Sequence, residues 1–215
     1  PVEYTTMYTR FWRNKPEIRF KERIHENVDW LRKPSNFVMT NDECLVIDRR
    51  DASVLRDPLR NLRILKAEYD SCLNTGIEPS KHVLLYLLEE SVAFANFVEE
   101  LTDEVVGKLL KIKDLSRSDL SLVWLYKGMI LEKLIDENSK KIKDNFEAME
   151  AYSLSASYGN GRGILNVALT HQRLKLDGWK DKLKAALSQC QTKLYPFGAS
   201  NREVYQAQQL LEDDK

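Results

Sequence analysis

Two hydrophobic periods divide this chain of 215 residues. Over residues 1–50, apolar and polar side chains alternate, most clearly in Tyr8-Thr9-Arg10-Phe11-Trp12-Arg13 and in Ile18-Arg19-Phe20. Alternation with a period of two is typical of half-buried strands, and Asn14-Lys15-Pro16 supplies a turn between two of them. We therefore predict strands and loops over residues 1–50, including a strand at 44–48.

From about Pro58 onward, the apolar residues recur at the spacing of α-helices. Asp57 is a suitable N-cap ahead of Pro58, and Asn74-Thr75-Gly76 is a suitable end for the first helix. Gly159-Asn160-Gly161 and Asp177-Gly178 predict breaks between later helices. The predicted helices cover residues 58–74, 79–97, 103–113, 119–136, 138–158, 164–176, 179–194 and 200–212.

The short connections predict that neighbouring helices pair in an antiparallel way. Residues 122–156 and 166–196 resemble two tetratricopeptide-type helix pairs, in which small residues such as Gly128 and Ala168 allow close packing. The predicted fold class is α+β. A short strand-rich segment, residues 1–57, precedes a mostly α-helical array of antiparallel helices, residues 58–215.

Composition limits the classes of function. Hydrophobic residues make up 43% and charged residues 31%, as in soluble globular proteins, and no apolar stretch is long enough to span a bilayer. The formal net charge is zero, so no overall field attracts the chain to nucleic acid or to an anionic membrane. Cys44, Cys72 and Cys190 match no zinc-binding spacing and predict reduced thiols in a cytoplasmic protein.

Several motifs together carry a resemblance to a known family. Arg10-Phe11-Trp12-Arg13, then Arg19-Phe20 in an apolar strand, then Ile24-His25-Glu26 resemble the late part of bacterial family-2 glycosyltransferases. The closest resemblance is to the group with a tetratricopeptide-like helical extension. In that group a strand and a helix follow, and here Cys44-Leu45-Val46-Ile47-Asp48 and Arg60-Asn61-Leu62-Arg63-Ile64-Leu65 match them.

The resemblance implies an inverting glycosyltransferase that uses a sugar-nucleotide donor. Residues 1–57 would be the end of a GT-A-like α/β domain, and residues 58–215 would be the helical extension. The nucleotide-binding half, with its Asp-x-Asp carboxylate pair, would lie upstream, either in the same protein or in a separate chain. We expect this chain alone to be incomplete and inactive as a transferase.

The resemblance places the catalytic base in the Ile24-His25-Glu26 motif. Glu26 would remove the acceptor proton, and His25 would face the donor phosphate or the metal, because adjacent strand residues point to opposite faces. The alternative is structural: His25 is a hydrogen-bonded residue of the domain wall, and Glu26 pairs with Arg23 or Arg19.

Cationic and aromatic residues near this motif are candidates for donor contacts. Arg13, and with it Arg10, would bind the diphosphate of the donor, although surface ion pairing is the alternative for both. Trp12 would stack on a sugar or nucleobase, or would pack in the core beside Phe11.

The chain departs from the family at one position. The family places His, followed closely by Gly, after the strand that here ends at Ile47, whereas this chain has Asp48-Arg49-Arg50. Asp48 could bind a divalent metal, Mn²⁺ or Mg²⁺, through oxygen. Alternatively, Arg49 or Arg50 holds the diphosphate in place of the metal, or the site is altered and inactive.

The acceptor is left open by these motifs. It could be a protein or peptide side chain, a cell-surface glycan, or a modified nucleic-acid base, and the helical part could form a homodimer. A second function belongs to another class: a non-catalytic helical-repeat adaptor for protein interaction, in which the first strands only cap the array.

Overall fold

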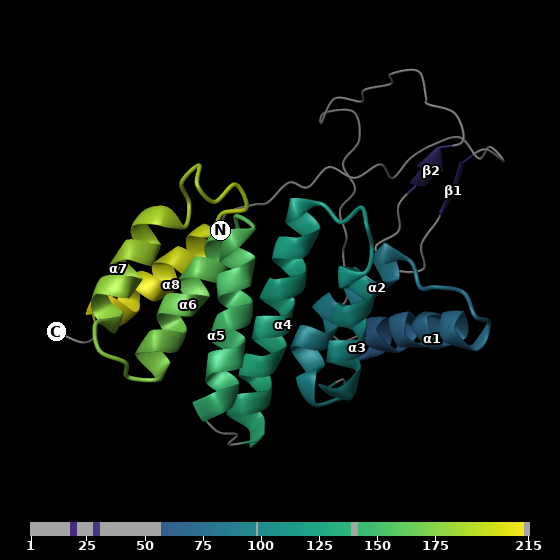
Figure 1. The fold of residues 1–215 in the computed structure, drawn as a ribbon, viewed down its shortest axis with the longest axis horizontal. Coiled ribbons are helices and arrows are strands. Elements are labelled where there is room, and N and C mark those ends of the chain that lie inside the picture. Colours follow the sequence, from purple (N-terminus) through teal and green to yellow (C-terminus); the bar gives the residue numbers. More distant parts are fainter. Residues whose placement is uncertain (1–17, 21–27, 31–56, 98, 139–141, 213–215) are drawn as a thin grey trace. The chain divides into compact units, whose positions relative to one another are not determined.

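The computed structural model describes residues 18–20, 28–30, 57–97, 99–138 and 142–212 (Figure 1). The chain forms two compact units, residues 1–65 and residues 66–215. Among the described residues, eight α-helices form an all-helical array, which agrees with the helices predicted after residue 58.

The described part of the first unit holds two short strands. Strand β1 is Ile18–Phe20 and strand β2 is Val28–Trp30. They pair antiparallel, with Ile18 opposite Trp30. The period-two pattern at residues 18–20 is therefore a strand, whereas the predicted strand at 44–48 lies outside the described residues.

Helix α1, Arg60–Asn74, ends where the sequence predicts but begins two residues after the predicted start at Pro58. The backbone carbonyl of Asp57 accepts a hydrogen bond from the Arg60 N–H at 3.1 Å, and its Oδ1 accepts one from the Leu59 N–H at 3.0 Å. The Asp57 carboxylate also pairs with Arg63 at 2.9 Å. Asp57 is thus the capping residue, and Pro58 lies ahead of the first helical turn.

The second unit contains the other helices. They are α2 Lys81–Ser91, the 3₁₀-helix η1 Val92–Phe97, α3 Glu99–Leu110, α4 Arg117–Asn138, α5 Ile142–Ser157, α6 Gly161–Arg173, α7 Trp179–Gln189 and α8 Asn201–Glu212. Successive helices from α4 to α8 pack against each other in chain order. This order is visible in the ribbon, where α4, α5 and α6 lie side by side (Figure 1).

The predicted antiparallel pairing is confirmed for α4 and α5. Arg117, the first residue of α4, donates hydrogen bonds to the backbone carbonyls of Tyr158 at 3.0 Å and Ser157 at 3.2 Å. These carbonyls lie at the C-terminal end of α5, where a cation interacts favourably with the helix dipole. The start of α4 therefore lies beside the end of α5.

Helix α4 lies inside the array. None of its residues from Ser118 to Leu134 is fully exposed, and Val123 and Ile130 are 0% exposed. A helix with apolar residues on most of its sides is typically enclosed by neighbours. Here the neighbours are α2, α3, η1 and α5. The helix is therefore the central element around which the first pairs of the array pack.

One predicted helix boundary is wrong for a physical reason. Gly159-Asn160-Gly161 was expected to break the chain until residue 164, but α6 begins at Gly161. The side chain of Asn160 accepts hydrogen bonds from the N–H groups of Arg162 and Gly163, which starts the helix earlier. The glycines are needed for packing: a Cβ on Gly161 would lie 1.8 Å from the backbone oxygen of Cys190.

Other boundaries also differ from the prediction. The segment predicted as one helix over 79–97 forms two elements, α2, which ends at Ser91, and then η1. Within η1, Phe94 leaves helical geometry with φ −134° and ψ 45°. The helix expected over 103–113 runs from Glu99 to Leu110. The helix expected over 179–194 ends at Gln189, because the Thr192 N–H bonds to the Gln189 carbonyl and turns the chain.

None of the helices in the described ranges has the length and apolar character needed to cross a membrane.

Candidate functional site

The site residues predicted from the sequence all belong to the N-terminal part of the chain. The structure describes none of them, so their positions relative to one another stay predictions. These residues are Arg10, Trp12, Arg13, His25, Glu26, Asp48, Arg49 and Arg50. Of the motifs that carry the resemblance, only Arg19-Phe20, in β1, and the Arg60–Leu65 part of α1 lie in the described residues.

In the second unit, alternate helices are joined by ion pairs. Lys81 at the start of α2 binds Asp119 near the start of α4 at 2.9 Å. Arg162 at the start of α6 binds Glu203 near the start of α8 at 2.5 Å. Each of these bridges brings two helix starts together, those of α2 and α4 and those of α6 and α8.

The same arrangement continues between α4 and α6. Arg173, the last residue of α6, binds Glu132 in the C-terminal part of α4 at 2.5 Å. The bridged residues are 38 positions apart for Lys81 and Asp119, and 41 apart for Glu132 and Arg173. Ion pairs thus link α2, α4, α6 and α8 in series, and we call this set the even-helix layer. Its linked residues are about 40 positions apart, a spacing found in helical-repeat proteins.

Two carboxylates in this layer each have two roles. Asp119 and Ser116 form a capping box at the start of α4, with N–H to side-chain distances of 3.0 and 3.1 Å. Glu203 and Ser200 form the same motif at the start of α8, at 2.9 and 3.3 Å. Since Asp119 also binds Lys81, and Glu203 also binds Arg162, each capping carboxylate joins its helix to the preceding helix of the layer.

The electrostatics of Asp119 follow from these contacts. Burial alone would raise the pKa of this carboxyl group, but hydrogen bonds from Lys81 and Ser116 hold it below its usual value. Asp119 is therefore a charged structural group and not a candidate acid for catalysis.

A buried tyrosine connects three helices. Tyr152 of α5, which is 0% exposed, donates from its hydroxyl to Glu132 of α4 at 2.5 Å. Glu132 also binds Arg173 of α6. Burial and the charge of Glu132 raise the pKa of Tyr152 well above its usual range. The ring needs Gly128 beside it, because a Cβ there would lie 2.6 Å from Tyr152 Cε1. Tyr152, Glu132 and Arg173 therefore join α5, α4 and α6, and the Tyr152 hydroxyl stays protonated.

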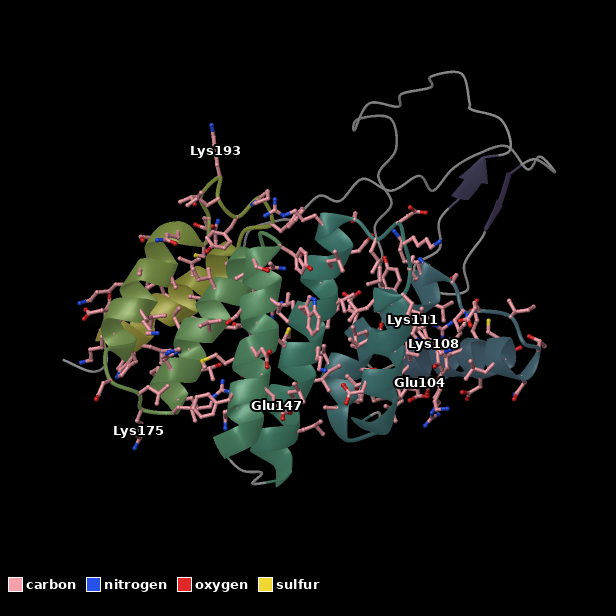
Figure 2. All side chains as sticks on the ribbon, viewed as in Figure 1. Glu104, Lys108, Lys111, Glu147, Lys175 and Lys193 are labelled. Atoms are coloured by element: carbon pink, nitrogen blue, oxygen red, sulfur yellow. The ribbon has the colours of Figure 1, made fainter. Side chains whose placement is uncertain are left out.

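An open depression of about 580 Å³ lies at the turn between α6 and α7. It is lined by Gln172 and residues 175–180. Lys175 has a left-handed backbone with φ 51°, and Gly178 has φ 72°. Lys175 extends from the turn at the lower edge of the array (Figure 2). This feature of the second unit combines a cavity with an aromatic ring and polar side chains.

His171 and Cys190 are buried side chains of the second unit. His171 is buried, and its Nδ1 lies 2.9 Å from the Val167 carbonyl. Cys190 is a buried free thiol whose pKa is raised by burial. In the described ranges, no group of three or more His, Cys, Asp or Glu residues is placed to hold a metal ion. The proposed metal ligands Asp48 and His25 lie outside those ranges.

Comparison with protein-family models, with curated proteins and with solved structures finds no match to this chain. A functional assignment therefore rests on the residues and geometry described above. Two signals in the sequence point to the even-helix layer, namely Ser116-x-x-Asp119 and Ser200-x-x-Glu203, which have the pattern of capping boxes.

Proposed function

We propose that this chain is the acceptor-side part of an inverting, sugar-nucleotide-dependent glycosyltransferase with a helical extension. The observation that carries the proposal is the order of the motifs Arg10–Arg13, Arg19-Phe20 and Ile24–Glu26 ahead of a helical array. A nucleotide-binding half, upstream in the same protein or in a partner chain, would complete the enzyme.

In this proposal Glu26 acts as the general base on the acceptor nucleophile. As the acceptor attacks the anomeric carbon, its proton passes to the carboxylate, and the bond to the nucleotide diphosphate breaks. Arg13, with Arg10, Arg49 and Arg50, would balance the negative charge of the departing diphosphate. A divalent cation, Mn²⁺ or Mg²⁺, would add positive charge there, with Asp48 and His25 as the candidate ligands.

The helical unit would hold the acceptor. The observation that supports this role is the even-helix layer, in which ion pairs join α2 to α4, α4 to α6 and α6 to α8. Helical-repeat arrays offer extended surfaces that suit binding of other macromolecules. The acceptor classes considered are a protein or peptide, a glycan and a modified nucleic-acid base.

The base can be tested in the complete enzyme, with the donor-binding half present. Glu26→Gln preserves the shape of the side chain but removes its ability to take a proton. We expect turnover to fall by about 10²–10⁴-fold while sugar-nucleotide affinity is retained. Glu22→Gln, four residues away and outside the motif, is the matched control and should keep normal turnover. Normal turnover of Glu26→Gln would remove Glu26 from the mechanism.

The second candidate function is a non-catalytic helical-repeat adaptor. The even-helix layer favours it, because the layer repeats at about 40 residues and is stabilised without any catalytic group. The two functions differ in one measurement. Sugar-nucleotide hydrolysis or transfer that is lost in Glu26→Gln supports the enzyme, whereas a complete protein without either activity, tested over a panel of sugar nucleotides, supports the adaptor.

A further inference from the structure

The depression at the α6–α7 turn has a fixed backbone. The N–H of Lys175 bonds to the Gln172 carbonyl, and the N–H of Leu176 bonds to the His171 carbonyl, both at 3.0 Å. After this turn, the N–H of Trp179 bonds to the Leu176 carbonyl at 3.3 Å. The volume of about 580 Å³ is within the range of small-molecule sites, which is about 300–1,000 Å³.

Trp179 gives the depression an anchored aromatic surface. It is the first residue of α7, is half-buried, and packs against the core cluster that includes Leu183 and Ala186. The ammonium of Lys180 lies over the face of the Trp179 ring, 5.6 Å from its centre. A sugar stacked on this face would displace the flexible lysine to the edge of the ring, where the ammonium can donate to a hydroxyl group.

Polar groups of several kinds line the same depression. The amide of Gln172 both donates and accepts hydrogen bonds, the carboxylate of Asp177 accepts, and the ammonium groups of Lys175 and Lys180 donate. In the part of the chain that the structure describes, no ion pair or side-chain hydrogen bond involves Lys175 or Asp177. Both therefore have bonding capacity left for a ligand.

The backbone of Lys175 adds a second reason to consider this turn. Its left-handed conformation, φ 51°, is one that glycine adopts without strain at a helix end. A lysine in this conformation is disfavoured relative to a right-handed one, because its Cβ comes close to the following carbonyl oxygen. A strained non-glycine residue is a reason to ask what its side chain does.

We propose that this depression binds the ring of a neutral saccharide, with one sugar face on Trp179 and the hydroxyl groups bonded to Gln172, Asp177 and the lysines. Sugar hydroxyls both donate and accept, and the lining offers partners for both. A phosphate only accepts and would meet the Asp177 carboxylate, whereas an organic cation would meet two lysines. The site does not depend on the glycosyltransferase proposal, because its support lies within residues 172–180.

Binding can be measured on the whole chain by following the amide signals of residues 175–180 and the indole N–H of Trp179 by NMR. The probes are glucose, galactose and N-acetylglucosamine, each titrated to about 50 mM. We expect saturable shifts with a dissociation constant in the millimolar range for at least one sugar. Inorganic phosphate and a short acidic peptide are titrated in parallel.

The variants separate the site from general effects on folding. Trp179→Ala should weaken binding by about tenfold or more, and Trp179→Phe, which keeps a flat ring, should stay within about threefold. Lys175→Gly removes the ammonium and relieves the left-handed strain, so a three- to tenfold loss of affinity cannot come from unfolding. Trp124→Phe is the matched control, since Lys127 lies 5.9 Å from the Trp124 ring in an equivalent pair.

The outcomes decide the proposal. Sugar-induced shifts that are lost in Trp179→Ala and kept in Trp124→Phe support it. The absence of shifts with all three sugars overturns it. Sugar-induced shifts that persist in Trp179→Ala also overturn the proposal. So does a result in which only phosphate or the acidic peptide perturbs these signals. Because the readout is binding, a failure of sugar transfer in the complete enzyme leaves this result unaffected.

Discussion

The two turns at the ends of α6 use glycine in opposite ways. At the N-terminal end, Gly161 is buried, and its N–H bonds to the carbonyl of Phe197 at 2.8 Å. A Cβ at this position would overlap the backbone of Cys190. At the C-terminal end, Gly178 is exposed and has no atom within 4 Å of an added Cβ, so only its φ of 72° requires glycine.

This difference separates two kinds of constraint within one helix. The first turn is constrained by packing against segments distant in sequence, since Phe197 also donates to the Gly159 carbonyl at 3.1 Å. The second turn is held by local backbone hydrogen bonds and by Trp179 packing on the core, and its residues Lys175, Asp177 and Gly178 are exposed. We therefore expect the first turn to determine stability, and the second to be available for function.

The largest expected effect comes from Gly161→Ala. The new Cβ would lie 1.8 Å from the Cys190 oxygen, so the backbone must move and the loop before α8 must separate from α6. We expect the free energy of unfolding to fall by more than about 3 kcal/mol, measured by urea denaturation. Gly107→Ala is the control, because nothing lies within 4 Å of its Cβ position. A loss below about 1 kcal/mol for Gly161→Ala would contradict the packing.

Tyr152→Phe tests the side-chain contacts at the C-terminal end of α6. It removes a hydrogen bond to the charged Glu132, and the free energy of unfolding at pH 7 should fall by about 1.5–3 kcal/mol. The pKa of Tyr152 is raised by burial and by Glu132, so its stabilising effect is present below the unfolded value of about 10 and is lost as the pH rises above it.

The pH dependence of that variant gives an independent check. Between about pH 9.5 and 11, the wild-type chain should lose stability more steeply than Tyr152→Phe. Tyr69 and Tyr126 also have raised pKa values, because of burial and then Glu104 and Glu89, and should maintain a residual alkaline slope in the variant. The free energy of unfolding is measured by urea titration at several pH values. If it falls equally with pH in both chains, Tyr152 does not contribute to the alkaline loss of stability.

Asn160→Ala should have a smaller effect at the N-terminal turn. The side chain is 4% exposed and accepts hydrogen bonds from the N–H groups of Arg162 and Gly163. Loss of such a cap typically reduces the free energy of unfolding by about 1–2 kcal/mol. Asn160→Asp keeps the acceptor and should recover most of this loss in thermal denaturation. If Asn160→Ala leaves the free energy of unfolding unchanged, the cap does not position α6.

The smallest change is expected for Gly178→Ala at the C-terminal turn. Alanine meets no neighbouring atom there, and only the left-handed backbone opposes it, by about 1 kcal/mol. The melting temperature should therefore fall much less than for Gly161→Ala. Similar losses for the two alanine variants would remove the distinction between the turns.

Local patterns in the sequence predict much of the helical unit. The period of apolar residues after Pro58 predicts the helices, and the short connections predict their antiparallel pairing. The start of α6 could not be predicted, because Gly161 and Gly163 are needed by contacts with Cys190 and with Tyr152, which are distant in sequence or on another helix. A local reading treats such glycines as breaks.

The candidate sites differ in how far the sequence predicts them. The motif containing His25 and Glu26 is recognised from residue order alone, and its geometry lies outside the described residues. Trp179 was predicted only as the start of a helix. Its place in a depression depends on the left-handed backbone of Lys175, which no preference of lysine indicates.

The shared carboxylates of the even-helix layer have a consequence for how the array unfolds. Asp119 caps α4 and binds Lys81 of α2, so a helix start that frays also releases the preceding helix of the layer. Glu203 couples α8 to α6 in the same way through Arg162. Nearest-neighbour coupling determines whether a repeat array melts in stages or as one unit. These two side chains therefore favour cooperative melting of adjacent repeats.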